Sequence, residues 1–107
     1  MIRKHSKNVE KVENRESGFE GMSARYLWTR EDGCQNFAMR LMAFEPEGKT
    51  SYHSHFEDHE FFILEGEAGY VDAFKKEIRL KPGDTVYVPP EEPHQIKNAG
   101  SGTLRLL

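Results

Sequence analysis

Turn-forming residues interrupt this chain at short intervals from Met22 onward, and this spacing constrains the fold more than any other feature of the sequence. Short apolar runs bounded by Gly, Pro, Asn and Asp are typical of all-β domains. No segment combines a long helical period with helix start and stop signals. We therefore expect an all-β fold, an antiparallel β-barrel or jelly roll. The expected strands cover residues 24–29, 37–44, 51–55, 59–64, 69–73, 77–80, 85–88, 94–97 and 103–107.

The length of the chain, 107 residues, suits a single domain with one core. Residues 1–20 are highly charged and carry only scattered apolar residues, Val9, Val12 and Phe19. We expect this stretch to form a loose N-terminal arm with a short strand near Val9 to Val12. Residues 21–107 then form a single β-barrel domain.

The composition narrows the choice of partners and location. The net charge of -3 and the absence of a basic patch argue against nucleic acid as a partner. The longest apolar run, Phe61 to Leu64, is far shorter than the ~18 residues of a membrane helix. The basic start Met1 to His5 has no apolar stretch behind it, and Cys34 has no cysteine partner. We therefore expect a cytoplasmic protein that binds neither nucleic acid nor membranes.

Three of the five histidines fall within seven residues, at His53, His55 and His59, and His94 follows a Pro-rich turn. Neutral imidazole is the commonest side-chain ligand of transition metals. Residues i and i+2 of a β-strand share a face, so His53 and His55 can reach one ion from one side of a sheet. A helical zinc-protease motif is the alternative, because His55 and His59 are four residues apart. Phe56 stands where that motif requires Glu, and the flanks favour strands.

The histidines also lie in two ordered motifs that resemble those of the cupins. The first motif runs from a glycine through His-x-His and a third ligand to another glycine: Gly48, His53, His55, His59 and Gly66. The gap between Gly48 and His53 is one residue shorter than the family pattern. The second motif has every family spacing, in the order Gly83, Pro89, Glu91, His94 and Asn98. Its one departure is Glu91, which stands where the family has its second glycine.

Two neighbouring residues, His59 and Glu60, are candidates for the third metal ligand in the first motif. The family usually has Glu there, and the six residues before Gly66 favour His59. Glu60 remains the alternative, because a gap of four residues after His55 is also tolerated. Strand alternation does not decide between them, since either residue could belong to the inward face of residues 59–64.

The resemblance is to the small single-domain cupins of the conserved-barrel type with a four-histidine site. It implies a homodimer and one divalent transition metal (Fe, Mn, Cu, Ni or Zn) held by His53, His55, His59 and His94. Four neutral ligands would leave the +2 charge of the ion uncompensated, which favours anionic ligands. Metal identity depends on geometry, because imidazole suits several of these ions.

We expect a metal-dependent oxygenase, dioxygenase-like, that acts on a small organic substrate. A non-catalytic small-ligand-binding cupin and a redox-neutral isomerase or cyclase are the alternatives. No acid or base lies clearly beside the histidines, which weakens the isomerase or cyclase, and no catalytic residue is assigned. Arg40 alternates with apolar residues and could face solvent, but the resemblance favours an orientation into the barrel mouth. The expected substrate pocket contains Arg40, Tyr52, Phe61, Ile96 and Leu106.

Overall fold

The computed structural model describes all residues, Met1–Leu107, and contains nine β-strands, two short 3₁₀ helices and no α-helix. None of its helices combines the length and apolar character needed to cross a membrane. The elements in chain order are η1 (Ser6–Asn8), β1 (Val12–Glu13), β2 (Glu20–Trp28), η2 (Arg30–Asp32), β3 (Met39–Lys49), β4 (His59–Glu65), β5 (Ala68–Val71), β6 (Glu77–Leu80), β7 (Thr85–Val88), β8 (Gln95–Asn98) and β9 (Leu104–Leu106).

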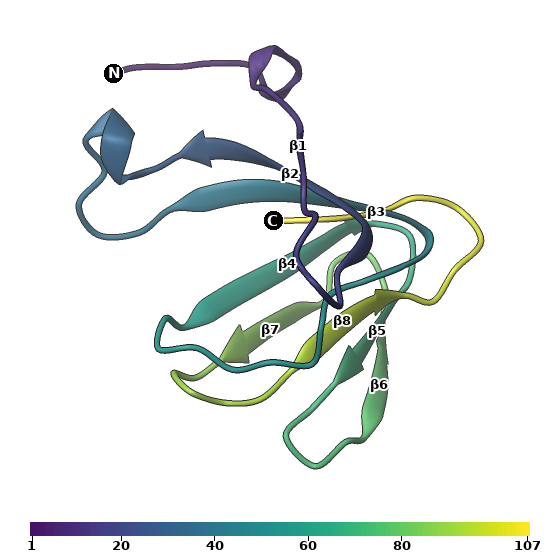
Figure 1. Ribbon diagram of the computed structural model, residues 1–107. Helices are drawn as coiled ribbons and strands as arrows, with labels where there is room; N and C mark the ends of the chain where they lie inside the picture. The colour runs from purple at the N-terminus through teal and green to yellow at the C-terminus, as the bar shows by residue number, and fades with distance from the viewer.

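The strands form one curled antiparallel sheet. The strand order is β6-β5-β8-β3-β9-β4-β7. Outside this order, β2 pairs with β3 and β1 pairs with β2. Figure 1 shows the long β2 and β3 strands above, and the shorter strands β4 to β8 curling below them. The predicted all-β barrel or jelly roll is confirmed.

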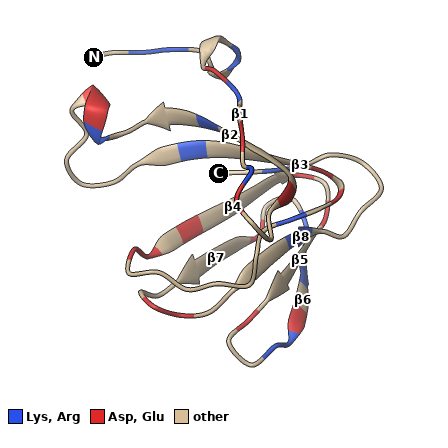
Figure 2. Ribbon diagram, in the orientation of Figure 1, with Lys and Arg blue, Asp and Glu red and all other residues tan.

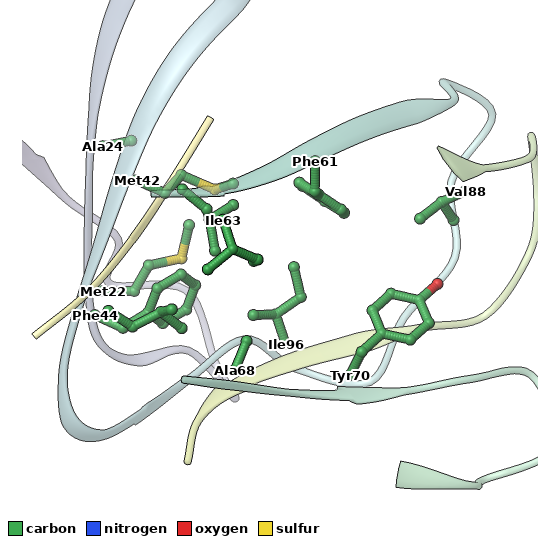
Figure 3. Packing of buried hydrophobic residues seen from close by; sticks show 12 residues of the cluster. Met22, Ala24, Met42, Phe44, Phe61, Ile63, Ala68, Tyr70, Val88 and Ile96 are labelled. Carbon is green, nitrogen blue, oxygen red and sulfur yellow. The ribbon is translucent and has the colours of Figure 1, made fainter. Parts of the chain in front are cut away.

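The inner face of the curled sheet forms the core. Across β2 and β3, Met22 pairs with Phe44 and Ala24 with Met42, and all four are buried. Figure 3 shows these side chains converging with Phe61 and Ile63 of β4 and with Ala68, Tyr70 and Ile96 from the opposite part of the sheet. Burial of these residues against one another follows from the period of two along each strand.

Three expected strands differ most from the structure, and the one predicted at residues 24–29 begins at Glu20. The strand predicted at residues 51–55 is wrong, because this segment makes only one isolated bridge, between His53 and His94. The strand predicted at residues 37–44 begins at Met39 and continues to Lys49. Glu20 pairs with Lys49 while Met22 pairs with Phe44, so the Pro-Gly turn signal at residues 46–48 forms a bulge inside the strand and does not end it.

The N-terminal arm lies against the barrel. β1 pairs with β2 through Val12 and Ala24, and the Arg25 guanidinium donates a hydrogen bond to the Val9 carbonyl. Gly18 has a left-handed φ of 88°, and a Cβ at this position would lie 2.9 Å from the Ser51 Cβ. Only glycine fits this close approach without strain. The division into an arm of residues 1–20 and a barrel of residues 21–107 stays a prediction.

Candidate metal centre

Three histidines meet at the open end of the barrel. His53 and His94 face each other across the isolated bridge, joined by two backbone hydrogen bonds of 3.0 and 2.9 Å. One ring nitrogen from each of His53, His55 and His94 lies within 4.8 Å of the others. Ligand nitrogens at about 2.0–2.1 Å from one ion lie roughly 3–4 Å apart. The three imidazoles are therefore gathered closely enough to bind a single ion after small adjustments.

Each of these imidazoles is anchored by a backbone carbonyl two residues away. His53 Nδ1 lies 2.8 Å from the Ser51 oxygen, His55 Nδ1 lies 2.8 Å from the Glu57 oxygen, and His94 Nδ1 lies 2.9 Å from the Glu92 oxygen. A carbonyl only accepts hydrogen bonds, so Nδ1 carries the proton and the lone pair lies on Nε2, the nitrogen that can bind an ion. This arrangement of ring N–H anchors is the one that orients histidine ligands of metals, and the donor set fits a transition ion.

His59 lies beside this group on β4. It shares the inner face of the strand with the buried residues Phe61 and Ile63, whereas Glu60 lies on the outer, exposed face. His59 Nε2 is 2.8 Å from His55 Nε2, and its ring stacks on Phe61 with 5.1 Å between centroids. The fold thus places His59, and not Glu60, next to the three clustered imidazoles.

Burial lowers the pKa of two of these histidines. The pKa of His59 falls to about 4, chiefly through burial and then through the positive charge of Arg40 and the other histidines. Burial also lowers the pKa of His94. Both rings are therefore neutral near pH 7, which is the form that binds a metal ion.

These shifts predict how pH affects the metal-free protein. Histidines of the unfolded chain have a pKa of about 6.5, so the unfolded state binds more protons than the folded state between that value and about 4. The free energy of unfolding should therefore decrease as pH falls through this window. Urea unfolding in the presence of a chelator, at about pH 7 and about pH 5, measures the decrease. The variant His59→Phe should show a smaller decrease, and an unchanged one would contradict the assignment to His59.

The histidines open into a cavity of about 490 Å³. Arg40, Phe61 and Ile96 line it, together with the four histidines. Tyr52 and Leu106, also expected there, lie elsewhere. Tyr52 donates a hydrogen bond to the Asp72 carbonyl and its ring lies beneath the Lys75 ammonium, whereas Leu106 is fully buried in the core.

Several residues of the cavity were not expected from the sequence. Tyr26 pairs with Arg40 across β2 and β3 and so shares its inner face, a relation that only strand pairing reveals. Asn14, Glu16 and Phe19 come from the N-terminal arm, whose charged composition suggested a loose segment. The remaining apolar lining is Met22 and Met42.

Tyr70 supports His94 from within the core. Its ring lies nearly parallel to the His94 imidazole, at 7° with 6.4 Å between centroids. Its hydroxyl is buried without a hydrogen-bond partner and points to the Val88 side of the core in Figure 3. Burial raises the pKa of Tyr70 to about 12, so the hydroxyl keeps its proton. In the view of Figure 2, acidic residues lie on β4 and on the loops before β4 and after β7, whereas a basic residue lies above them on β3.

Comparison with protein families and curated proteins places the chain among known relatives. A family described as "Cupin domain" matches residues 40–107. An uncharacterised protein of Methanocaldococcus jannaschii is 40% identical over 67 residues, which is 61% of this chain and 53% of the relative. The chain thus spans about half the length of that curated relative.

Solved structures share the fold over nearly the whole chain. The polyketide cyclase RemF from Streptomyces resistomycificus is 30% identical with a TM-score of 0.91, covering 99% of this chain and 75% of RemF. A predicted oxalate decarboxylase of Thermotoga maritima is 24% identical with a TM-score of 0.83, covering 98% and 94% of the two chains. The match of residues 40–107, the RemF similarity and the curled sheet agree: the chain belongs to the cupin family.

Proposed function

We propose that this chain is a metal-dependent enzyme that acts on a small organic anion. The observation that carries the proposal is that three imidazoles with carbonyl-anchored Nδ1 atoms and an arginine line one cavity. We assign one divalent transition ion (Fe, Mn, Cu, Ni or Zn) to His53, His55, His94 and, as fourth ligand, His59. The bound ion supplies Lewis acidity and, for redox-active metals, oxygen chemistry.

The fourth ligand can be tested by two neighbouring substitutions. His59→Ala should weaken metal binding by about 10-fold or more, because it removes a ligand on the inner face of β4. Glu60→Ala should leave metal binding unchanged, because Glu60 is exposed on the other face. Competition of each variant against a chelator of known affinity measures both effects. Metal loss in Glu60→Ala, with retention in His59→Ala, would assign the ligand to Glu60.

The protein contributes binding and orientation in the cavity. Four neutral ligands would leave the charge of the ion uncompensated, so the ion and Arg40 both attract an anion. The planar guanidinium of Arg40 matches a carboxylate through two parallel hydrogen bonds. Phe61 and Ile96 provide apolar surface beside these charges, and such surface excludes water and strengthens the electrostatic attraction.

Arg40→Ala should therefore weaken binding of a small carboxylate by about 10- to 100-fold, the effect expected for a hydrogen bond to a charged group. Metal content should not change, because Arg40 donates no ligand. Titration calorimetry of the zinc-loaded protein with benzoate measures the loss. Arg79→Ala is the matched control, since Arg79 is an exposed arginine of β6 outside the cavity. Equal affinities for benzoate in wild type and Arg40→Ala would reject the role of Arg40.

The first candidate reaction is oxygenation, dioxygenase-like, of a small organic substrate. The cavity of about 490 Å³ can hold a small substrate together with oxygen. Oxygen uptake by Fe-, Mn- and Cu-reconstituted protein, screened against small enols, thiols and alkenes, tests this reaction. Uptake that depends on both metal and substrate supports it, and no uptake with any metal rejects it.

The second candidate is a redox-neutral cyclisation or isomerisation, and the cavity gives it specific support. Glu16, Glu57 and Tyr26 line the cavity and can move protons, whereas the sequence alone placed no acid or base there. The Glu57 carboxylate lies 3.8 Å from His55 Nδ1. RemF, a polyketide cyclase, is similar over 99% of this chain. Substrate conversion without oxygen uptake would favour this reaction. If the metal-loaded protein binds anions but converts none of them, the chain is a non-catalytic binding protein.

A homodimer, as expected from the family resemblance, also remains a proposal, as does the cytoplasmic location. The outer faces of β4 and β7 expose Phe62, Leu64 and Tyr87, which are apolar or aromatic side chains that a second copy could cover. Sedimentation equilibrium measures the mass directly. A monomer at all concentrations would contradict the dimer.

A further inference from the structure

One wall of the metal cavity comes from outside the part of the chain that matches the cupin family. The match covers residues 40–107, whereas Asn14, Glu16 and Phe19 of the arm line the cavity. Residues 14–19 therefore add to the lining that residues 40–107 provide. We call residues 14–19 the arm wall.

The arm wall is held in a defined position by contacts at both ends. The Asn14 N–H donates to the Met22 carbonyl at 3.0 Å, and Gly18 packs against Ser51 in the left-handed conformation described above. The Phe19 ring lies 5.6 Å from the His53 ring. Ser51 is also the residue whose carbonyl anchors His53. The arm wall thus contacts the same short segment that orients a metal ligand.

Two opposite charges line this cavity without neutralising each other. Arg40 comes from β3 and Glu16 from the arm wall, and neither side chain makes an ion pair or a side-chain hydrogen bond with any other residue. Glu57, the other acid of the cavity, is already near His55. A ligand that carries both an acid group and a hydrogen-bond donor would satisfy Arg40 and Glu16 together.

We propose that the arm wall selects the substrate, and that the substrate class is a hydroxylated organic acid with a flat apolar body. The carboxylate of the ligand faces Arg40, and its hydroxyl donates a hydrogen bond to the Glu16 carboxylate. The body lies against Phe19, Met42 and Phe61, which line the same cavity. This inference rests on the function proposed above.

The test compares acids that differ only by a hydroxyl group. Benzoate, 3-hydroxybenzoate and 4-hydroxybenzoate are titrated into the zinc-loaded protein and followed by calorimetry. Wild-type protein should bind at least one hydroxybenzoate about tenfold more tightly than benzoate, because a hydrogen bond to a charged acceptor contributes about this factor. Glu16→Ala should bring the ratio of the hydroxybenzoate and benzoate affinities close to one, while the metal content stays the same.

Two controls isolate the arm wall. Glu10→Ala removes the same charge from the same arm at an exposed position outside the cavity, and should keep the tenfold difference. Gly18→Ala should reduce the difference, because its Cβ would push the arm wall away from Ser51. Gly33→Ala imposes the same left-handed strain at φ 94° with nothing within 4 Å, and should keep the difference.

The outcomes separate this inference from the proposed function. If Glu16→Ala keeps the full preference for the hydroxylated acid, or wild type shows none, the arm wall does not select the substrate. If Arg40→Ala binds benzoate as tightly as wild type does, the role of Arg40 in the proposed function fails instead. No binding of any of the three acids to wild-type protein would overturn both.

Discussion

Replacement of His94 by alanine should leave the purified protein with little bound metal, and should weaken metal binding by at least about 100-fold. Loss of a partner that only orients a ligand costs about 10- to 100-fold, and loss of the ligand itself costs more. His94 is only 3% exposed, its Nδ1 is anchored by the Glu92 carbonyl, and its ring contacts those of His53, His55 and His59. Elemental analysis after metal loading and gel filtration gives the number of ions per chain.

His5→Ala is the matched control for this experiment. His5 lies in the exposed start of the arm, where its ring caps the short helix η1 by accepting a hydrogen bond from the Lys7 N–H. It should keep one ion per chain. Full metal occupancy in His94→Ala would show that the ion binds without His94 and would contradict the assigned site.

Phe44→Ala should destabilise the folded protein by about 3–5 kcal/mol, the usual effect of deleting a buried aromatic side chain and leaving a cavity. Phe44 is fully buried at the closed end of the barrel, opposite Met22 and next to Leu104 along the pairing of β3 with β9. The free energy of unfolding from urea titration measures the loss.

Phe74→Ala provides the comparison, because the Phe74 side chain is 89% exposed in the turn after β5. A substitution at such a site usually changes the free energy of unfolding by no more than about 0.5 kcal/mol. The backbone carbonyl of Phe44 also accepts a hydrogen bond from the Asn98 side chain, and this bond persists in the alanine variant. Equal effects at Phe44 and Phe74 would contradict the position of the core.

The sequence was most informative where its residues alternate. Strands β6 and β7 have the predicted limits, because alternating residues between clear turn signals leave one register. The histidine spacing predicted one site of four histidines, and three of them, His53, His55 and His94, gather within reach of one ion. The sequence did not show which of His59 and Glu60 lies on the inner face of β4, since both alternations were equally apolar. His59 as a metal ligand stays a prediction.

The sequence was less informative where long-range contacts decide the conformation. Residues 51–55 have strand-like composition, but His53 bonds to the carbonyl two residues before it, and the segment leaves the ladder after one bridge. Pro46 and Gly48 are typical of the end of a strand, but here they lie in a bulge opposite Gly21 and the strand continues. The arm is charged and lacks a motif, so only its contact with Ser51 shows that it borders the cavity.

The carbonyl anchors of the histidines have a consequence for how this protein can vary. The acceptors belong to the backbones of Ser51, Glu57 and Glu92, and every amino acid supplies the same oxygen at those positions. Ligand orientation is therefore encoded in the path of the chain and not in neighbouring side chains. Such a scaffold can exchange the side chains that border the metal, and with them its substrate, through single mutations that leave the coordination geometry intact.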